Sequence, residues 1–98
     1  MAKAYWVTTY RSIKNPDAMA AYSKLAGPAI AAAGGRFLIR GVANEAWEAG
    51  LKQRVVVIEF ESMEKALAAH DTEDYQTALK ALGKDACERD MRVVEGAS

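Results

Sequence analysis

The sequence predicts an α+β fold of the ferredoxin-like class, in which helices cover one face of a four-stranded antiparallel sheet. Two observations predict it. A chain of 98 residues can bury one hydrophobic core, so we expect a single domain over residues 1–98. Strand-like and helix-like patterns follow in the order β-α-β-β-α-β, and right-handed crossovers in each βαβ half place both helices on the same side.

The first predicted strand covers residues 4–11 and ends near Lys14. Its β-branched and aromatic side chains suit a pleated, half-buried surface. Asn15, Pro16 and Asp17 follow with the chemistry of a helix start. Asn caps the helix, Pro needs no N–H at the first position, and Asp suits the positive end of the helix dipole.

The first helix is predicted from an apolar stripe at helical spacing over residues 18–33. Gly27 and Pro28 interrupt this stripe, and Pro28 removes one hydrogen bond within the helix. We therefore expect a kink or a break at this point. Gly34 and Gly35 end the helix, because glycine supplies the left-handed turn found at helix C-termini.

Two further strands are predicted at residues 36–42 and 53–60. The second of them is apolar on both faces, which places it in the interior of the sheet. Residues 43–52 between them either extend the earlier strand past a bulge at Gly41 or form a short hairpin arm.

The rest of the chain completes the pattern with a helix in two pieces and a last strand. Ser62 caps the first piece, which runs to about Ala69, and residues 71–72 open the second, which Gly83 ends. The last strand is predicted at residues 91–95.

Charge and cysteine content exclude several classes of protein. Thirteen Lys and Arg balance thirteen Asp and Glu, so the net charge is zero, which does not suit a nucleic-acid binder or a polybasic membrane protein. Cys87 is the only cysteine, so a framework of disulfides within the chain is excluded. No apolar run reaches the roughly 18 residues of a membrane span, and the N-terminal residues lack a secretory signal. We therefore expect a cytoplasmic protein with no nucleic-acid partner and no membrane partner.

Two sequence blocks resemble a known family. Residues 34–41 (GGRFLIRG) and 56–62 (VVIEFES) stand in order with Tyr5-Trp6, Asp74-Tyr75 and residues 94–96. Together they resemble domain-of-unknown-function family 1330, and the resemblance covers essentially the whole chain. It implies a dimeric α/β barrel, a superfamily that also contains small monooxygenases, lactone isomerases and stress-responsive proteins.

The resemblance implies a fold and an assembly but no reaction, because the family has no established one. The sequence also departs from the family pattern at three positions. Val42, His70 and Glu73 stand where a glycine, an aromatic residue and a proline are usual.

Alternation along residues 53–60 predicts a homodimer. The bulkier set, which we assign to the helices, is Val56, Ile58 and Phe60. The opposite set is Val55, Val57 and Glu59. In a monomer its valines would lie in water beside Leu38 as an exposed apolar patch. We expect two copies to pack these faces together, burying on the order of 1,600 Å² and enclosing a cavity.

The same alternation places Phe37 and Ile39 toward the helices, and Arg36 and Arg40 on the opposite face with Glu59. Two arginines near one carboxylate either bind a small anion, because guanidinium donates bidentately to carboxylates, or form an ordinary cross-strand ion pair. Ion pairs are the commoner arrangement.

His70 is the only histidine and is the natural general acid or base, with Asp71 able to orient its ring. Alternatively, it is a solvated histidine at a helix C-terminus. One histidine and one distant cysteine cannot fill a zinc shell, so we expect no metal and no cofactor. We expect Cys87 to be an ordinary cysteine at a helix end or in a loop.

The aromatic side chains either line a pocket for an aromatic or quinone-like ligand or belong to the core. They are Tyr5, Trp6, Tyr10, Tyr22 and Tyr75.

Two functions follow for the expected cavity. The first is a cofactor-independent oxygenase or isomerase acting on a small, partly apolar acid or phenol. In it Arg40 holds the anion, Tyr22 or Tyr75 donates a hydrogen bond, and His70 or Glu59 moves the proton. The second is a non-catalytic ligand-binding or stress-linked dimer. An exposed His70 and a fully paired Glu59 would favour the second.

Overall fold

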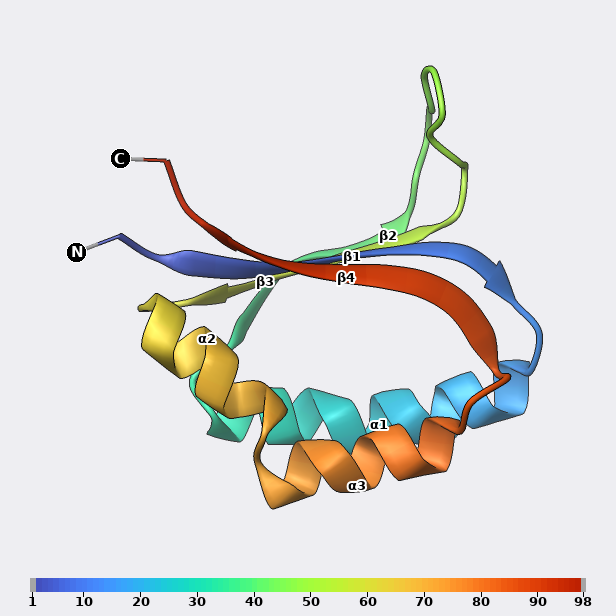
Figure 1. The fold of residues 1–98 in the computed structure, drawn as a ribbon. Helices are drawn as coiled ribbons and strands as arrows, with labels where there is room; N and C mark the ends of the chain where they lie inside the picture. The colour runs from blue at the N-terminus through green and yellow to red at the C-terminus, as the bar shows by residue number, and fades with distance from the viewer. Residues whose placement is uncertain (1, 98) are drawn as a thin grey trace.

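The computed structural model describes residues 2–97. The strands are β1 (Ala4–Ile13), β2 (Arg36–Val42), β3 (Arg54–Phe60) and β4 (Cys87–Glu95), and the helices are α1 (Pro16–Ala32), α2 (Met63–His70) and α3 (Glu73–Leu82). The strands form one antiparallel sheet in the order β2-β3-β1-β4, and the three helices lie on one face of it (Figure 1). The predicted ferredoxin-like α+β fold is confirmed, with its second helix divided into α2 and α3.

Each helix begins at a capping residue that the sequence predicted. The Asn15 side chain accepts a hydrogen bond from the backbone N–H of Ala18 at 3.1 Å at the start of α1. Ser62 and Thr72 cap α2 and α3 in the same way. These bonds satisfy N–H groups that have no partner within the helix.

Helix α1 continues through Pro28, so the helix is not broken there (Figure 1). The residue before a proline usually avoids helical dihedrals because its Cβ clashes with the proline ring. Gly27 has no Cβ, which removes that clash. Pro28 has no N–H to donate to the carbonyl of Lys24, four residues earlier. Because Lys24 and Pro28 are both exposed, water can donate to that carbonyl instead.

Strand β4 and the segment before β3 differ from the prediction. β4 begins at Cys87, which pairs with Ile13, so Cys87 is a strand residue rather than a helix-end or loop residue. Residues 43–53, hereafter the arm, project away from the helices as a long loop (Figure 1). A hydrogen bond from Ala43 N to Gln53 O, 3.0 Å long, closes the base of the arm.

A bulge in β2 lies at Leu38 rather than at Gly41, and it reverses the faces that follow. Ile39 pairs with Val57, and Arg40 pairs with Val56. Ile39 therefore lies on the face away from the helices and Arg40 faces them, so the opposite prediction for both residues was wrong. The physical reason is that a bulge inserts one unpaired residue and shifts the alternation by one position.

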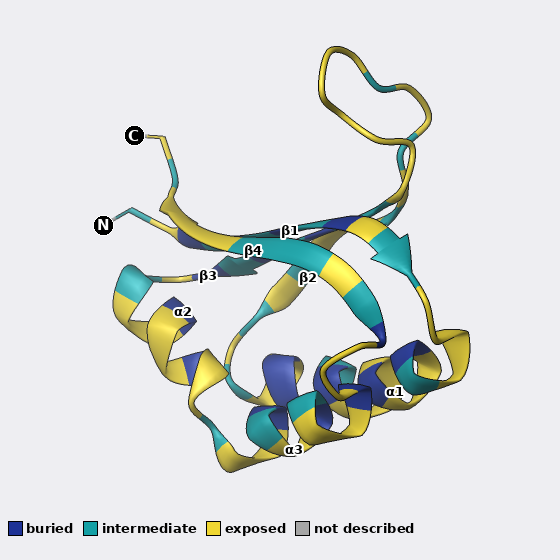
Figure 2. Ribbon diagram, turned by 45° about the vertical axis from the view of Figure 1, so that its right-hand side comes forward, coloured by how far each residue is buried: buried dark blue, intermediate teal, exposed yellow. Residues whose placement is uncertain are grey.

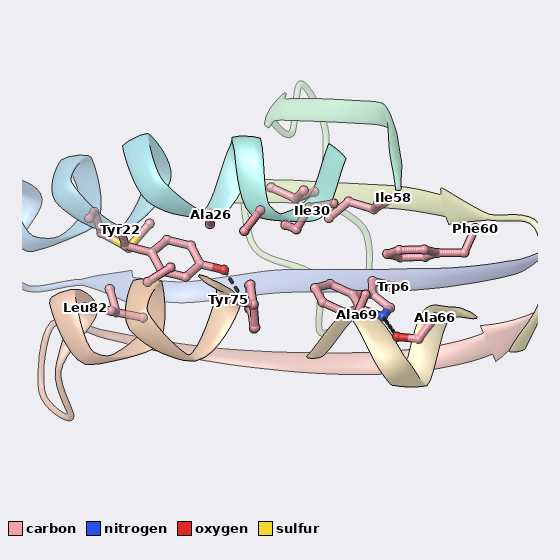
Figure 3. Close-up of a cluster of buried hydrophobic side chains, with 14 of the residues drawn as sticks. Trp6, Tyr22, Ala26, Ile30, Ile58, Phe60, Ala66, Ala69, Tyr75 and Leu82 are labelled. Carbon is pink, nitrogen blue, oxygen red and sulfur yellow. Dashed lines mark hydrogen bonds between the residues drawn. The ribbon is translucent and has the colours of Figure 1, made fainter. Parts of the chain in front are cut away.

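The hydrophobic core fills the space between the sheet and the helices (Figure 2). The largest fully buried side chains are Trp6, Phe60 and Tyr75. The Trp6 ring lies 5.2 Å from the rings of both Phe60 and Tyr75, and its Nε1 donates to Ala66 O at 2.8 Å (Figure 3). The inward set predicted for β3, Val56, Ile58 and Phe60, is buried as expected and belongs to the same core cluster.

The other face of the sheet, hereafter the open face, has none of the helices across it (Figures 1 and 2). The register places apolar side chains at its centre, namely Val7, Val55, Val57 and Ile39. Charged residues surround them, namely Arg36, Glu59, Asp90 and Arg92. The arm beside it carries Trp47, which is 79% exposed.

Candidate functional site

A cavity of about 40 Å³ lies between α1 and the helix-facing side of the sheet. Side chains from all four strands and from α1 line it. Part of its wall is apolar and aromatic, with Trp6, Phe37 and Ile58 among the lining residues. This is the composition expected of a small-molecule pocket, in which a few polar groups stand against an apolar wall.

Three arginines line this cavity, each from a different strand. They are Arg40 of β2, Arg54 of β3 and Arg89 of β4. No Asp or Glu is among the lining residues. Within residues 2–97, none of the three guanidinium groups forms a salt bridge. The cavity is therefore positively charged without an internal counter-ion.

Arg89 is held against two tyrosines. Its Nη1 donates to the Tyr10 hydroxyl at 3.0 Å and to the Tyr22 hydroxyl at 3.4 Å, and its guanidinium lies 4.9 Å from the centre of the Tyr22 ring. Burial acts to lower the pKa of Arg89, but its interactions with Tyr22 and Tyr10 outweigh burial and raise it. Burial raises the pKa of Tyr10, and this effect outweighs the opposite effect of Arg89. Tyr10 therefore stays neutral and Arg89 stays positively charged.

Arg54 and Arg40 occupy different depths. The Nε atom of Arg54 is buried and has no hydrogen-bond partner within residues 2–97. An unpaired buried donor costs about 1–3 kcal/mol, so an acceptor in the cavity would stabilise it. Arg40 is exposed and stacks 4.4 Å from the centre of the Phe37 ring, which places it at the mouth.

The predicted site residues divide among four places. Arg40 and Tyr22 lie at the cavity. Tyr75 is fully buried next to it, with its hydroxyl 2.8 Å from that of Tyr22 (Figure 3). The others do not line the cavity: Tyr5, Arg36 and Glu59 lie on the open face, and His70 lies at the end of α2.

Glu59 on the open face is paired. It accepts hydrogen bonds from the Tyr5 hydroxyl at 3.1 Å and from Lys3 Nζ at 3.3 Å, and it stands opposite Arg36 in the register. Burial acts to raise the pKa of Glu59, but the hydrogen bonds from Lys3 and Tyr5 outweigh it, and the net pKa is lowered. The hydrogen bond to Glu59 in turn raises the pKa of Tyr5. This is the arrangement of a cross-strand ion pair rather than of a general base.

His70 is exposed, with 51% of its side chain accessible, and its Nδ1 lies 3.2 Å from Asp71 Oδ1. Its ring lies 5.5 Å from the Tyr75 ring but does not reach the cavity. Nowhere in residues 2–97 do three His, Cys, Asp or Glu side chains gather as metal ligands would. Over the same residues, no helix is both long enough and apolar enough to span a bilayer.

The sequence did not predict Arg54 and Arg89 as site residues, although the pattern of the strand around each one indicates that it faces the helices. Arg54 continues the inward alternation of Val56 and Ile58, so it is a charged residue on an otherwise apolar strand face. Arg89 precedes Met91 on the inward side of β4, which was hidden because the strand was predicted to begin at residue 91.

The chain matches the family described as "Domain of unknown function (DUF1330)" over residues 3–97. No curated protein matches it.

Solved structures share its fold at low sequence identity. A protein of unknown function from Rhodopseudomonas palustris has a TM-score of 0.71 and 17% identity, covering 99% of this chain and 84% of that one. SnoaB from Streptomyces nogalater, a cofactor-independent oxygenase, has a TM-score of 0.64 and 12% identity, with 100% and 96% covered. A dimeric ferredoxin-like protein of unknown function from Thermobifida fusca has a TM-score of 0.56 and 15% identity, with 96% and 91% covered.

Proposed function

We propose, from the premise that this chain belongs to the DUF1330 family, that it binds a small, partly apolar anion in the cavity between α1 and the sheet. The observation that carries the proposal is the presence of three arginines, and of no carboxylate, in the lining of one cavity. A guanidinium group donates two parallel hydrogen bonds to a carboxylate, and its hydrogen bonds to an anion are stronger than those between neutral groups.

The size of the cavity limits the part of the ligand that is enclosed. Its volume of about 40 Å³ holds roughly three water-sized groups, since one needs about 10–15 Å³. The charged end of the ligand fits this space. The apolar remainder would extend past Phe37 to the mouth, where the exposed Arg40 side chain can move aside.

Catalysis on the bound anion, as a cofactor-independent oxygenase or isomerase, is the second candidate function. The fold likeness to SnoaB favours it. However, the two candidates for proton transfer do not line the cavity, because His70 is exposed at the end of α2 and Glu59 is paired on the open face. Their positions favour a non-catalytic binding protein. Binding without turnover is therefore the function that we propose first.

We further propose that the protein is a homodimer in the cytoplasm, joined through the open face. The apolar centre of that face, with Val7, Val57 and Ile39 side by side, supports this assembly, as does its charged rim. The single cysteine is half-buried and suits a reducing compartment.

The test of anion binding is calorimetric titration with benzoate and with its neutral isostere benzamide. We expect benzoate to bind and benzamide to bind far more weakly. Arg54→Gln should weaken benzoate binding by tenfold or more, because a hydrogen bond to a charged group contributes about 1.5–3 kcal/mol. Arg36→Gln, on the opposite face, should change the affinity little.

Equal binding of benzoate and benzamide, or equal losses in Arg54→Gln and Arg36→Gln, would contradict the proposal. Circular dichroism of both variants shows whether each keeps the fold, so a loss of binding is not confused with unfolding.

A further inference from the structure

The buried hydroxyl of Tyr75 determines how the hydroxyl proton of Tyr22 is used. Tyr75 is 0% exposed, and its hydroxyl has the Tyr22 hydroxyl as its hydrogen-bond partner (Figure 3). If Tyr22 donated this bond, the Tyr75 O–H would be buried without an acceptor in residues 2–97, an arrangement that folded proteins avoid. Tyr75 is therefore the donor and Tyr22 the acceptor.

Tyr22 consequently has its own proton left to donate. A hydroxyl has two lone pairs and one proton. The Tyr22 oxygen accepts from Tyr75 at 2.8 Å and from Arg89 at 3.4 Å, which uses both lone pairs. Its O–H finds no acceptor in residues 2–97, and its side chain lines the cavity.

Tyr10 presents a second donor at the same place. Its oxygen accepts from Arg89 Nη1 at 3.0 Å, and no acceptor for its proton is found in residues 2–97. Both tyrosines line the cavity, and both hydroxyl oxygens lie within 3.4 Å of the same arginine nitrogen. Two O–H groups therefore converge beside one positive charge.

We propose that Tyr10 and Tyr22, held by Arg89, form an oxyanion site that selects the ionised form of a phenol or enol over its neutral form. This inference rests on the proposed function and narrows the ligand class. A carboxylic acid is already ionised in neutral water, whereas a phenol or enol gives its proton to solvent on binding here. The only bond of the ligand that breaks is its O–H bond, whose proton goes to solvent, and no bond between heavy atoms changes.

The physical reason is that these donors are fixed before the ligand arrives. Donors that are already oriented toward a developing negative charge stabilise it without reorganisation, and more strongly than water does. Arg89 donates to both hydroxyl oxygens, and Tyr75, which does not line the cavity, donates to that of Tyr22, so Tyr75 is a positioning residue that does not touch the ligand. Thr8 and Ser23, whose hydroxyls can donate or accept, are the remaining neutral hydroxyl groups of the lining.

The experiment is an absorbance titration of 4-nitrophenol against pH, with and without the full-length protein, because its ionised form absorbs at a longer wavelength. We expect the protein to bind the ionised form at least about tenfold more tightly, which lowers the apparent pKa of the bound probe by about one unit or more. Tyr22→Phe and Tyr10→Phe should each reduce this shift. Tyr5→Phe, on the open face, should leave it unchanged.

The outcomes separate this inference from the proposed function. If 4-nitrobenzoate binds in a manner that depends on Arg54 but bound 4-nitrophenol keeps its solution pKa, the oxyanion site is overturned while anion binding stands. If neither probe binds, both proposals fail. If circular dichroism shows that Tyr22→Phe is unfolded, Tyr10→Phe decides, and an unchanged shift in that variant overturns the inference.

Discussion

Gly34 and Gly35, between α1 and β2, are required for different physical reasons. Gly34 has a φ of 93°, a left-handed conformation that side chains disfavour. Gly35 is needed for space, because a Cβ there would lie 2.5 Å from Ile30 Cγ2 and 3.0 Å from Ile58 Cγ2 and Phe60 Cε1. The sequence predicted the turn but not the close packing, which involves a strand more than twenty residues further along the chain.

Gly35→Ala should destabilise the protein by about 1–3 kcal/mol, the usual cost of overpacking a core. The measurement is urea unfolding followed by circular dichroism at a fixed protein concentration. Gly41→Ala is the matched control, since a Cβ at Gly41 meets nothing within 4 Å. The control should change the stability by no more than about 0.5 kcal/mol, and equal unfolding midpoints for the two variants would contradict the argument.

The charged residues of the cavity show what residue patterns cannot reveal. The sequence offered Arg36 and Arg40 on one face either as an anion site or as an ion pair with Glu59, and Arg40 lines the cavity on the helix side of the sheet. The second expected arginine, Arg36, stands on the opposite face, and the cavity instead contains Arg54 and Arg89. These two come together through the pairing of β1 with both β3 and β4, which is a tertiary property.

At the scale of elements, the bulge in β2 decides which arginine of this strand faces the cavity. Regular alternation along residues 36–42 would place Arg40 beside Arg36. One unpaired residue at Leu38 separates their faces. The position of a bulge depends on the partner strand, so periodicity within β2 alone could not locate it, even though the strand itself was predicted with its observed bounds.

Thr72 joins the two halves of the divided helix. Its hydroxyl accepts from the backbone N–H of Tyr75 at 3.2 Å, capping α3, and donates to Ala69 O at the end of α2 at 3.0 Å. One side chain therefore satisfies a group at each helix end and fixes the first turn of α3, which carries Tyr75.

Thr72→Ala should lower the free energy of unfolding by about 0.5–2 kcal/mol, the range for loss of an N-cap. Thr72→Ser keeps the hydroxyl and should recover most of that loss. Thermal and urea denaturation of the two variants provide the measurement. If serine behaves like alanine, then the methyl group rather than the hydroxyl carries the stability, and the capping argument is wrong.

At the scale of the whole molecule, the open face is where association is expected. The fold class was predictable because element order and crossover handedness leave few arrangements. The two faces of β3 were also assigned as observed, since β3 pairs regularly with β1. The cavity expected between two sheets needs a second copy and stays a prediction, whereas the cavity found within one copy lies between the sheet and α1.

Val57→Lys should convert the proposed dimer to monomer at micromolar concentration. A lysine at the centre of the open face would be buried unpaired in the interface, at a cost of about 3 kcal/mol or roughly a hundredfold in dissociation constant. Val93→Lys is the control, because Val93 is 41% exposed and pairs with Trp6 on the other face. Sedimentation equilibrium distinguishes the species, and a monomeric wild type or a dimeric Val57→Lys protein would refute the open-face dimer.

The pairing of β1 with β4 has a consequence for synthesis of the protein. Strand β1 lies beside β4, the last strand to be synthesised, and Gly96 N donates to Lys3 O at 2.7 Å (Figure 1). Arg89 arrives with that last strand, and it is the residue that orients Tyr10 and Tyr22. A nascent chain that has not yet reached residue 89 therefore lacks the arginine that donates to both hydroxyls, so the proposed oxyanion site forms only after β4 has been synthesised.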